Sequence, residues 1–156
     1  MIKLDKVSKS FLLGDQQLDI LRNITLSIKK GESVSIIGQS GSGKSTLMYM
    51  IGMLDAPSNG TVFLDNIDTS KLEDDEVSRL RNERIGFVFQ QFNLISKLNV
   101  LENVMLPVLY ARKRLSFDPR EKALALIKRF GIDHRTYSFP NKISGGEQQR
   151  VAIARA

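Results

Sequence analysis

The sequence has no cysteine and a single histidine, His134. Without cysteine the chain forms neither a disulfide nor a thiolate metal site, so a reducing cytosolic compartment is compatible with its composition. No apolar run approaches the roughly 20 residues that a membrane-spanning helix needs. Residues 1–5 contain an acid and do not begin a signal-peptide core. We therefore expect no direct membrane insertion, and a partner would have to hold the protein at a membrane.

Sequence repeats and low-complexity tracts are also lacking, and charge of one sign is not concentrated. The net charge of +6 suggests nucleic acid or anionic lipid. The cations, however, lie in small separate clusters with acids or amphipathic helices nearby. These clusters are Lys29-Lys30, Arg79 with Arg81 and Arg84, Arg112-Lys113-Arg114 and Lys128-Arg129. We interpret them as a solvated surface and expect no nucleic-acid partner. With 156 residues, 42% of them hydrophobic, the chain has the size of one domain with a sizeable core.

The residues that are present point first to a nucleotide. Residues 38–45 read Gly-Gln-Ser-Gly-Ser-Gly-Lys-Ser and match the phosphate-loop pattern G-x-x-x-x-G-K-S/T without a mismatch. A glycine-rich turn at a helix start directs several backbone N–H groups at one point, and the helix dipole adds positive potential there. We predict that Lys44 reaches the β- and γ-phosphate oxygens and that Ser45 ligates Mg²⁺. The predicted phosphate-binding residues are Gly38, Ser40, Gly41, Ser42, Gly43, Lys44, Ser45 and Thr46.

The segments around this loop predict the elements that such a motif requires. Residues 31–33 indicate a turn, residues 34–37 (Val-Ser-Ile-Ile) a short buried strand, and residues 46–51 the continuation of a helix. The alternative is a chance Gly/Ser-rich linker, and the flanking strand and helix argue against it.

The N-terminal part predicts antiparallel β structure. In residues 23–28 apolar and polar side chains alternate with the period of a half-buried strand, and Gly14-Asp15 marks the turn before it. Residues 55–60 predict a second turn and residues 61–64 another strand. Residues 70–73 have capping-box spacing for a helix start.

A further strand is predicted where Ile85, Phe87 and Phe89 alternate into Gln90-Gln91. It delivers a glutamine pair to its C-terminal end, where ligands collect in open α/β sheets.

From Val100 onward the period becomes helical. Ala123, Ile127 and Phe130 fall on one face of a helix that starts at Asp118-Pro119 and ends at Gly131. A later helix starts at residue 144.

Ser144 is a good N-cap for that helix, and Glu147 completes a capping box. Gly145 and Gly146 leave backbone N–H groups unshielded, which makes this end a second candidate anion-binding surface. The alternative is an ordinary glycine-containing cap.

Together the two motifs resemble the nucleotide-binding domain of ATP-binding cassette (ABC) proteins. Residues 143–148 look like that family's signature, usually Leu-Ser-Gly-Gly-Gln, and residues 149–156 continue it as Gln-Arg-Val-Ala-Ile-Ala-Arg-Ala. Gln90 is similar to the family's Q-loop glutamine, and Phe11 sits where the family places an aromatic that stacks on adenine. Residues 54–57 and 87–94 resemble the subgroup of lipoprotein-releasing and macrolide-exporting transporters.

The resemblance covers the whole chain and implies an α/β fold. This fold is a P-loop NTPase sheet with an N-terminal antiparallel β subdomain and an all-helical insert. Residues 1–156 would be a partial ABC nucleotide-binding domain, with the β and P-loop core in 1–91 and the helical subdomain with the signature helix in 92–156. The family continues into a strand ending in Asp-Glu and then a histidine. The resemblance therefore implies a C-terminally truncated, incomplete ABC ATPase domain, which we expect to be marginally stable alone.

The resemblance also implies a function. The chain would be the ATPase subunit of an ABC transporter, coupling ATP binding and hydrolysis to transport through a transmembrane permease subunit. Two such domains would pair head to tail, each ATP lying between one phosphate loop and the partner's Ser144, Gly145, Gly146 and Glu147. Lys44 and Gln90 would be catalytic, and Ser45 with Gln90 would hold Mg²⁺. The protein would be cytoplasmic, peripheral on the cytoplasmic face of the plasma or inner membrane.

Several residues depart from the family pattern or imitate it. Glu147 stands where Gln is usual, and we expect its charge near a partner's γ-phosphate to lower affinity across a dimer modestly. Asp65, at the end of the apolar segment 62–64, imitates a metal-binding Asp but precedes the glutamine segment, so we interpret it as structural. We expect His134 to be a surface residue in a helix connection and Glu102 a solvated helix residue.

Two other functions stay open. One is an ABC-type ATPase acting on nucleic acid or ribosomes. No sustained heptads separate Lys44 from Ser144, which argues against the DNA-repair type but not against the ribosomal one. The other is a binding-only fragment. For the 156-residue chain alone we expect nucleotide binding without turnover.

Overall fold

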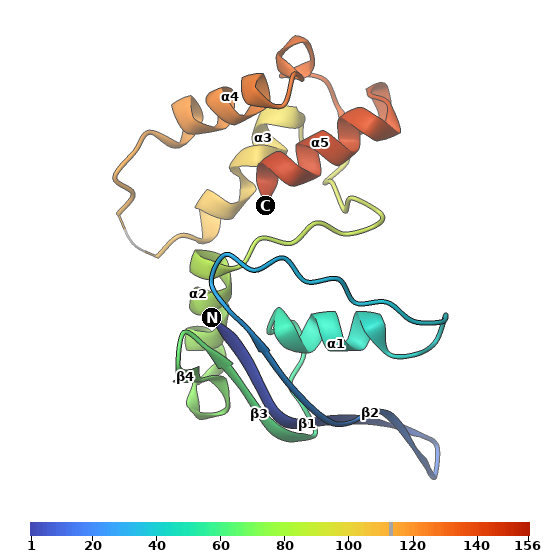
Figure 1. Ribbon diagram of the computed structural model, residues 1–156. Helices are drawn as coiled ribbons and strands as arrows, with labels where there is room; N and C mark the ends of the chain where they lie inside the picture. The colour runs from blue at the N-terminus through green and yellow to red at the C-terminus, as the bar shows by residue number, and fades with distance from the viewer. Residues whose placement is uncertain (113) are drawn as a thin grey trace. The chain divides into compact units, whose positions relative to one another are not determined.

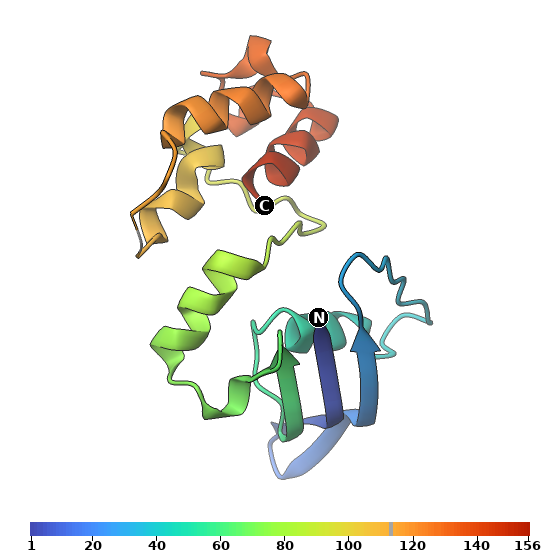
Figure 2. The ribbon, with the colours of Figure 1, turned by 60° about the vertical axis from the view of Figure 1, so that its left-hand side comes forward.

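The computed structural model describes residues 1–112 and 114–156. Lys113, in the middle of the predicted solvated cluster Arg112-Lys113-Arg114, lies outside the described residues. The chain divides into two compact units, residues 1–78 and residues 79–156, each with its own hydrophobic core. The first unit is a sheet with one helix across it and the second is helical (Figures 1 and 2). The predicted division after residue 91, between the β and P-loop core and the helical subdomain, stays a prediction.

The first unit is built on an antiparallel sheet in the order β2-β1-β3-β4. Its strands are β1 (Ile2–Leu13), β2 (Gln16–Ile28), β3 (Asn59–Leu64) and β4 (Ile67–Asp68), and α1 (Lys44–Ile51) supplies Met50 to the core. The turn at Gly14-Asp15 and the half-buried alternation of residues 24–28 are both present. The predicted antiparallel β structure is therefore confirmed.

A β-bulge in β1 sets which residues enter this core. Leu4 and Val7 are both fully buried although they are three positions apart, because the register shifts between them and Lys6 has φ +51°. Opposite the bulge, Gly60 has φ +86°, and a Cβ there would lie 2.3 Å from the Lys6 carbonyl oxygen. Only glycine fits between the two strands at this point.

Two predicted strands did not form in the described residues. Residues 34–37 pair with none of the four strands, and Ile37 is 89% exposed. In residues 85–89 the odd positions are half-buried and the even ones exposed, and the rings of Phe87 and Phe89 stack with centroids 5.5 Å apart, yet no ladder forms. Alternation makes a segment suitable for a strand, but only a neighbouring strand supplies the hydrogen bonds.

The second unit packs helices around one apolar cluster. Its elements are α3 (Val100–Met105), the 3₁₀ helix η2 (Leu106–Tyr110), α4 (Pro119–Arg129), the 3₁₀ helices η3 (Asp133–Arg135) and η4 (Pro140–Lys142), and α5 (Gly145–Arg155). As predicted, Asp118 caps α4, Pro119 takes its first position and Gly131 follows its end with φ +65°. Ala123 and Ile127 are buried, and Phe130 packs against the same cluster.

The predicted capping box at residues 70–73 is wrong. The Asp68 carboxylate accepts from both the Ser70 hydroxyl (2.6 Å) and the Ser70 N–H (3.0 Å), so Ser70 belongs to the 3₁₀ helix η1 (Thr69–Lys71). The helix begins later, as α2 (Asp74–Arg84), where Glu76 accepts from the Glu73 N–H. No helix in residues 1–112 or 114–156 has the length and apolarity needed to cross a bilayer.

Candidate functional site

The glycine-rich loop ends at the uncapped N-terminus of α1. Gly43 is the N-cap residue and has φ +86°, and no side chain caps the helix. Since first-turn N–H groups have no acceptor within a helix, those of Lys44, Ser45 and Thr46 are available to a ligand. This end therefore offers aligned donors and the positive end of the helix dipole to an anion.

The conformation of this helix start depends on glycine. A Cβ at Gly43 would lie 3.1 Å from both the Ile20 carbonyl oxygen and Leu21 Cδ2, in a left-handed region that other residues rarely adopt. The first residue of the loop is also confined, because a Cβ at Gly38 would lie 2.7 Å from Ser42 Oγ. The loop thus folds tightly on itself and against β2.

Lys44 folds back over this loop. Its ammonium donates to the carbonyl oxygens of Gly38 (2.9 Å) and Gln39 (2.6 Å). An ammonium has three N–H donors, so with these contacts one donor remains for an external acceptor. The side chain is therefore held beside the uncapped N–H groups and keeps a positive charge there.

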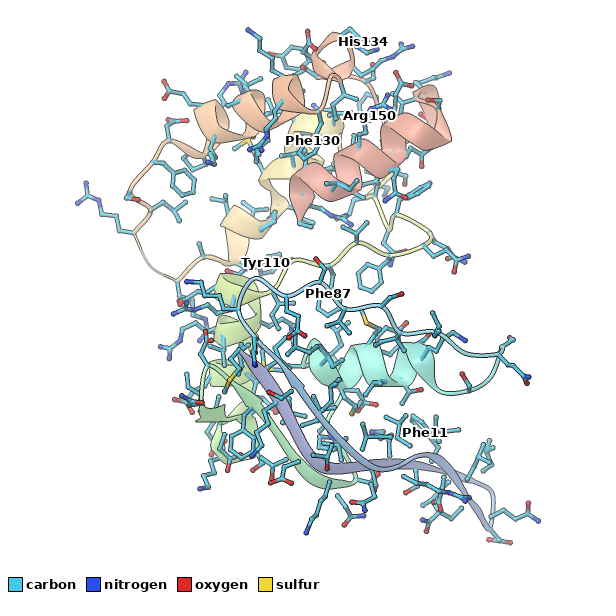
Figure 3. The ribbon with its side chains drawn as sticks, in the orientation of Figure 1. Phe11, Phe87, Tyr110, Phe130, His134 and Arg150 are labelled. Atoms are coloured by element: carbon cyan, nitrogen blue, oxygen red, sulfur yellow. The ribbon has the colours of Figure 1, made fainter. Side chains whose placement is uncertain are left out.

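Phe11 lies on β1, and the residue is 43% exposed (Figure 3). The Lys9 ammonium lies 5.1 Å from the ring centroid, a cation–π distance. The exposed part of the ring is an apolar surface on which a flat ligand could stack.

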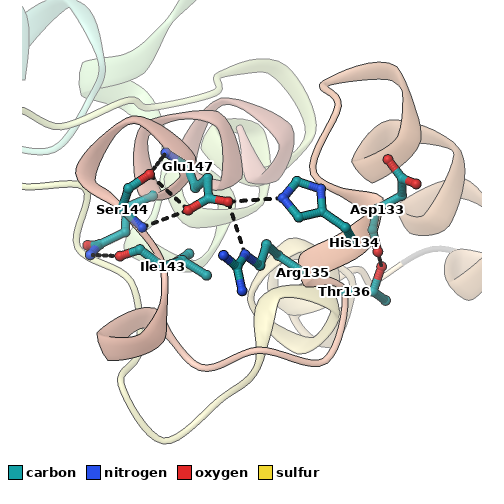
Figure 4. Close-up of polar contacts among 8 residues, drawn as sticks. Asp133, His134, Arg135, Thr136, Ile143, Ser144 and Glu147 are labelled. Carbon is teal, nitrogen blue, oxygen red and sulfur yellow. Dashed lines mark hydrogen bonds and ion pairs between the residues drawn. The ribbon is translucent and has the colours of Figure 1, made fainter.

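The second helix start, that of α5, is closed by its own side chains. Ser144 Oγ accepts from the Glu147 N–H at 3.3 Å, and Glu147 Oε2 accepts from the Ser144 N–H (2.7 Å) and hydroxyl (2.8 Å). Figure 4 shows these reciprocal bonds. The predicted capping box is confirmed.

The other oxygen of Glu147 reaches η3. Glu147 Oε1 accepts from Arg135 Nε at 3.1 Å and lies 3.1 Å from His134 Nε2 (Figure 4). The Ser144 N–H and hydroxyl, followed by Arg135 and His134, lower the pKa of Glu147 to about 2. The carboxylate is only 11% exposed, and its charge is offset by Arg135 within the same unit. The charge that Glu147 adds to the signature is thus compensated locally.

The three residues for which we predicted a structural or surface role, His134, Asp65 and Glu102, lie in the predicted environments. His134 lies in a helix connection and is 57% exposed, although its contact with Glu147 was not predicted. Asp65 accepts from the Met1 ammonium at 2.6 Å. Glu102 is exposed and belongs to the capping box of α3 with Asn99. No spacing rule connects residues 134 and 147, so the missed contact had no signal in the sequence.

The predicted site residues fall into two sets. Phe11 and residues 38–46 lie in the first unit, whereas Gln90 and residues 144–147 lie in the second. Gln90 is exposed and follows the stacked Phe87 and Phe89. In the part of the chain that the structure describes, no group of three or more His, Cys, Asp or Glu side chains could hold a metal.

Comparison with known proteins gives consistent matches. Residues 21–156 match the family described as ABC transporter. The ABC transporter ATP-binding protein MJ0796 of Methanocaldococcus jannaschii is 51% identical over 159 residues, which is all of this chain and 68% of that protein. The macrolide export ATP-binding/permease protein MacB of a Shewanella species is 47% identical over all of this chain and 24% of its own length.

A solved structure agrees with these sequence matches. It is the dimeric, post-hydrolysis state of the MJ0796 cassette bound to ADP and Pi, with a TM-score of 0.90 and 49% identity over 99% of this chain and 68% of that one. The matches confirm the family and the α/β fold class that the two motifs predicted.

Proposed function

The chain belongs to the ABC transporter family, and from this premise we propose that it is the ATP-binding subunit of a transporter. In this role it couples ATP binding and hydrolysis to transport through a membrane permease. The observation that carries the proposal is the uncapped start of α1, where Gly43 and Lys44 hold a cluster of donors beside an exposed loop. Such a cluster of donors suits a polyphosphate.

The phosphate loop fits a magnesium–nucleotide complex through its donor chemistry. The backbone N–H groups of residues 40–46 and the Lys44 ammonium are all donors, as phosphate oxygens require. The Ser45 hydroxyl and the Gln90 amide oxygen are hard oxygen donors of the type that Mg²⁺ prefers, and they would hold the ion, which would neutralise phosphate charge when bound. The exposed ring of Phe11 would stack on the base. Lys44 stabilises the transferred phosphoryl group, and Gln90 orients the attacking water or the metal.

The glycines at the start of α5 support a second role in nucleotide binding. A Cβ at Gly145 would meet nothing within 4 Å, and at Gly146 only Arg150 Nη1 at 3.9 Å. Glycine costs about 1 kcal/mol relative to alanine inside a helix, and here neither φ nor neighbours demand it. The open space at their Cβ positions instead suits close approach by a phosphate of a nucleotide held by another subunit.

That arrangement requires two copies paired head to tail. Each nucleotide would then lie between residues 38–46 of one copy and residues 144–147 of the other. MJ0796, which this chain resembles at 49% identity, has been solved as a dimer bound to ADP and Pi. The dimer of this chain is a proposal that rests on that similarity and on the two separate helix starts.

The membrane partner is proposed from the relatives. MacB is named as an ATP-binding/permease protein, and this chain spans 24% of it. We place the protein on the cytoplasmic face of the membrane, bound to a permease of this general kind. The names of the relatives reported above refer to transport and not to nucleic acid or ribosomes, so the alternative ATPase function has no support from them.

The proposal is tested by calorimetric titration of the chain with Mg-ATP. Lys44→Ala should weaken binding at least about tenfold, because it removes the cation beside the phosphates. Lys71→Ala is the matched control in the same unit, since Lys71 is 80% exposed and makes only a 3.4 Å surface ion pair with Asp68. Equal ATP affinity in wild type and Lys44→Ala would overturn the proposal.

Release of phosphate by the same sample tests the binding-only alternative for the 156-residue chain. Binding without release supports it, and steady turnover contradicts it.

A further inference from the structure

Arg155, in the last turn of α5, binds two successive backbone carbonyls of a distant segment. Its Nη2 donates to the Phe92 carbonyl oxygen at 2.7 Å and its Nη1 to the Asn93 carbonyl oxygen at 2.6 Å. Both residues lie in the second unit, 62 or more positions away in sequence. These are short charge-assisted bonds made by a planar, two-pronged donor.

The segment that Arg155 holds has an unfavourable backbone. Phe92 has φ +58° and Asn93 has φ +48°, so two successive non-glycine residues are left-handed. The Asn93 N–H donates to the Gln91 carbonyl oxygen at 2.6 Å, which closes a strained γ-turn around Phe92. Left-handed backbone is better tolerated by Asn, but it is rare for a bulky residue such as Phe92 and persists there only where surrounding contacts enforce it.

Asn103 holds the next part of the same segment from α3. This fully buried side chain accepts from the Ile95 N–H at 2.8 Å and donates to the carbonyl oxygens of Ile95, Leu98 and Asn99 at 3.1, 2.9 and 3.0 Å. Residues 95–99 are thus attached to the helical core. The strained turn at residues 92–93 lies between this attachment and Gln90.

We infer that Arg155 is a positioning residue that ties the orientation of Gln90 to the helix bearing Ser144–Glu147. The Arg155 guanidinium holds the turn that begins two residues after Gln90, and Arg155 belongs to the same continuous helix as Gly145 and Gly146. A shift of α5 would therefore move the turn at residues 92–93. In the other direction, the contact between this turn and Arg155 would resist a shift of Gln90. This inference rests on the proposed function, because it gives Gln90 and the α5 start their roles.

A purely structural role would give a different result. If the two bonds only stabilised the fold, removing them would lower stability throughout the unit without a selective effect near Gln90. If they position Gln90, the phosphate loop in the first unit should still bind ATP while the catalytic step slows. The discriminating quantities are kcat against KM and the local exchange of backbone amides.

The experiment compares Arg155→Ala and Arg155→Lys in the intact protein, with Arg129→Ala as control. Arg129 is also in the last turn of a helix of the second unit, and it is exposed. We expect Arg155→Ala to lower kcat about tenfold or more with the KM for ATP changed less than about threefold. Arg155→Lys should be intermediate, because an ammonium is a point donor without the planar geometry needed to bind both carbonyls well.

Hydrogen exchange supplies a readout that does not depend on turnover. Amides of residues 90–95 should exchange faster in Arg155→Ala, while those in the middle of α3 and α4 keep wild-type rates. If the alanine variant does not fold, the lysine variant carries the same comparison.

Three outcomes would overturn the inference: unchanged kcat and exchange, faster exchange spread evenly over the unit, or a KM effect as large as the kcat effect. Failure of the wild type to bind or hydrolyse ATP would overturn the proposed function, and the exchange data would still decide whether Arg155 holds the turn.

Discussion

The two helix starts that carry the candidate site differ in how their N–H groups are satisfied. At α1 the N-cap is a left-handed glycine, no side chain caps the helix, and Lys44 adds a cation. At α5 the N-cap is Ser144 in extended backbone, and Glu147 completes a capping box whose carboxylate is paired with Arg135. The first-turn N–H groups are thus available to a ligand at α1, whereas at α5 side chains occupy part of them.

Of the two helix starts, only that of α1 is equipped to bind an anion by itself. The α1 start offers free N–H groups and net positive charge, so it can hold phosphate oxygens without help. The α5 start has used part of its donor capacity internally and carries a carboxylate, although Gly145 and Gly146 leave access to the remaining N–H groups. We therefore expect α1 to bind nucleotide alone, and α5 to act only on a nucleotide already held elsewhere.

Gly43→Ala should disrupt the uncapped start of α1, and we expect it to have the largest effect on ATP affinity. The new Cβ would meet the Ile20 carbonyl oxygen at 3.1 Å in a left-handed backbone, so the loop has to move and ATP affinity should fall more than about tenfold. Titration with Mg-ATP measures this. Gly14→Ala is the control, because Gly14 also has positive φ but open space around it, and it should lower the melting temperature without changing affinity.

Ser144→Ala should remove the cap of α5 and leave the uncapped start of α1 unchanged. Loss of this N-cap should lower the free energy of unfolding by about 1 kcal/mol, measured by urea denaturation. Nucleotide affinity of the isolated chain should stay at the wild-type value. Ser144→Asp should restore most of the stability lost, since Asp is an equally good N-cap. A Ser144→Ala variant as stable as wild type would contradict the capping role.

Glu147→Gln should show how much the stability that the α5 cap provides depends on pH. The pKa of Glu147 is lowered from 4.5 to about 2 in the folded state, so the carboxylate stabilises the fold above pH 4.5. This contribution is lost as pH falls from about 4.5 to 2. The stability difference between wild type and Glu147→Gln should therefore be greatest near neutral pH and shrink on acidification in this window.

Urea denaturation at pH 7, 4 and 3 would measure that difference. Glu102→Gln is the matched control, because Glu102 occupies the capping box of α3 and is exposed. A difference for Glu147→Gln that does not change with pH would show that the hydrogen bonds from Ser144 and the ion pair with Arg135 do not lower the pKa of Glu147 in solution.

Gly145→Ala should have the smallest effect on the isolated chain. A Cβ at this position meets nothing within 4 Å, and Gly145 is the first residue of α5, where glycine costs less than in a helix interior. Stability should therefore rise by less than about 0.5 kcal/mol, and ATP affinity should be unchanged. In the intact protein the added methyl would restrict access to the N–H groups of α5 and weaken ATP-dependent dimerisation, measured by light scattering. A large loss of stability in the chain itself would instead show that glycine is needed by the fold.

The sequence by itself determined the features that depend on near neighbours. The phosphate-loop pattern, the cap at Ser144 with Glu147 and the limits of α4 all follow from residues within about one helical turn. Their hydrogen bonds form between groups only a few positions apart, so residue types at fixed spacing are sufficient to predict them. The family followed from two such motifs in order along the chain.

Features that depend on partners far away in the sequence could be read only from the tertiary structure. The short apolar segment 34–37 and the alternation in residues 85–89 favoured strands, but pairing needs a neighbour, and neither segment has one in the described chain. The error at residues 70–73 was instead a local one, because Ser70 bound Asp68, two positions away, and did not cap a helix.

The contacts of Glu147 with Arg135 and of Arg155 with Phe92 and Asn93 join segments that no spacing rule connects. Their partners become neighbours only when the helices pack around the buried core, and that packing is a property of the whole unit rather than of any short segment.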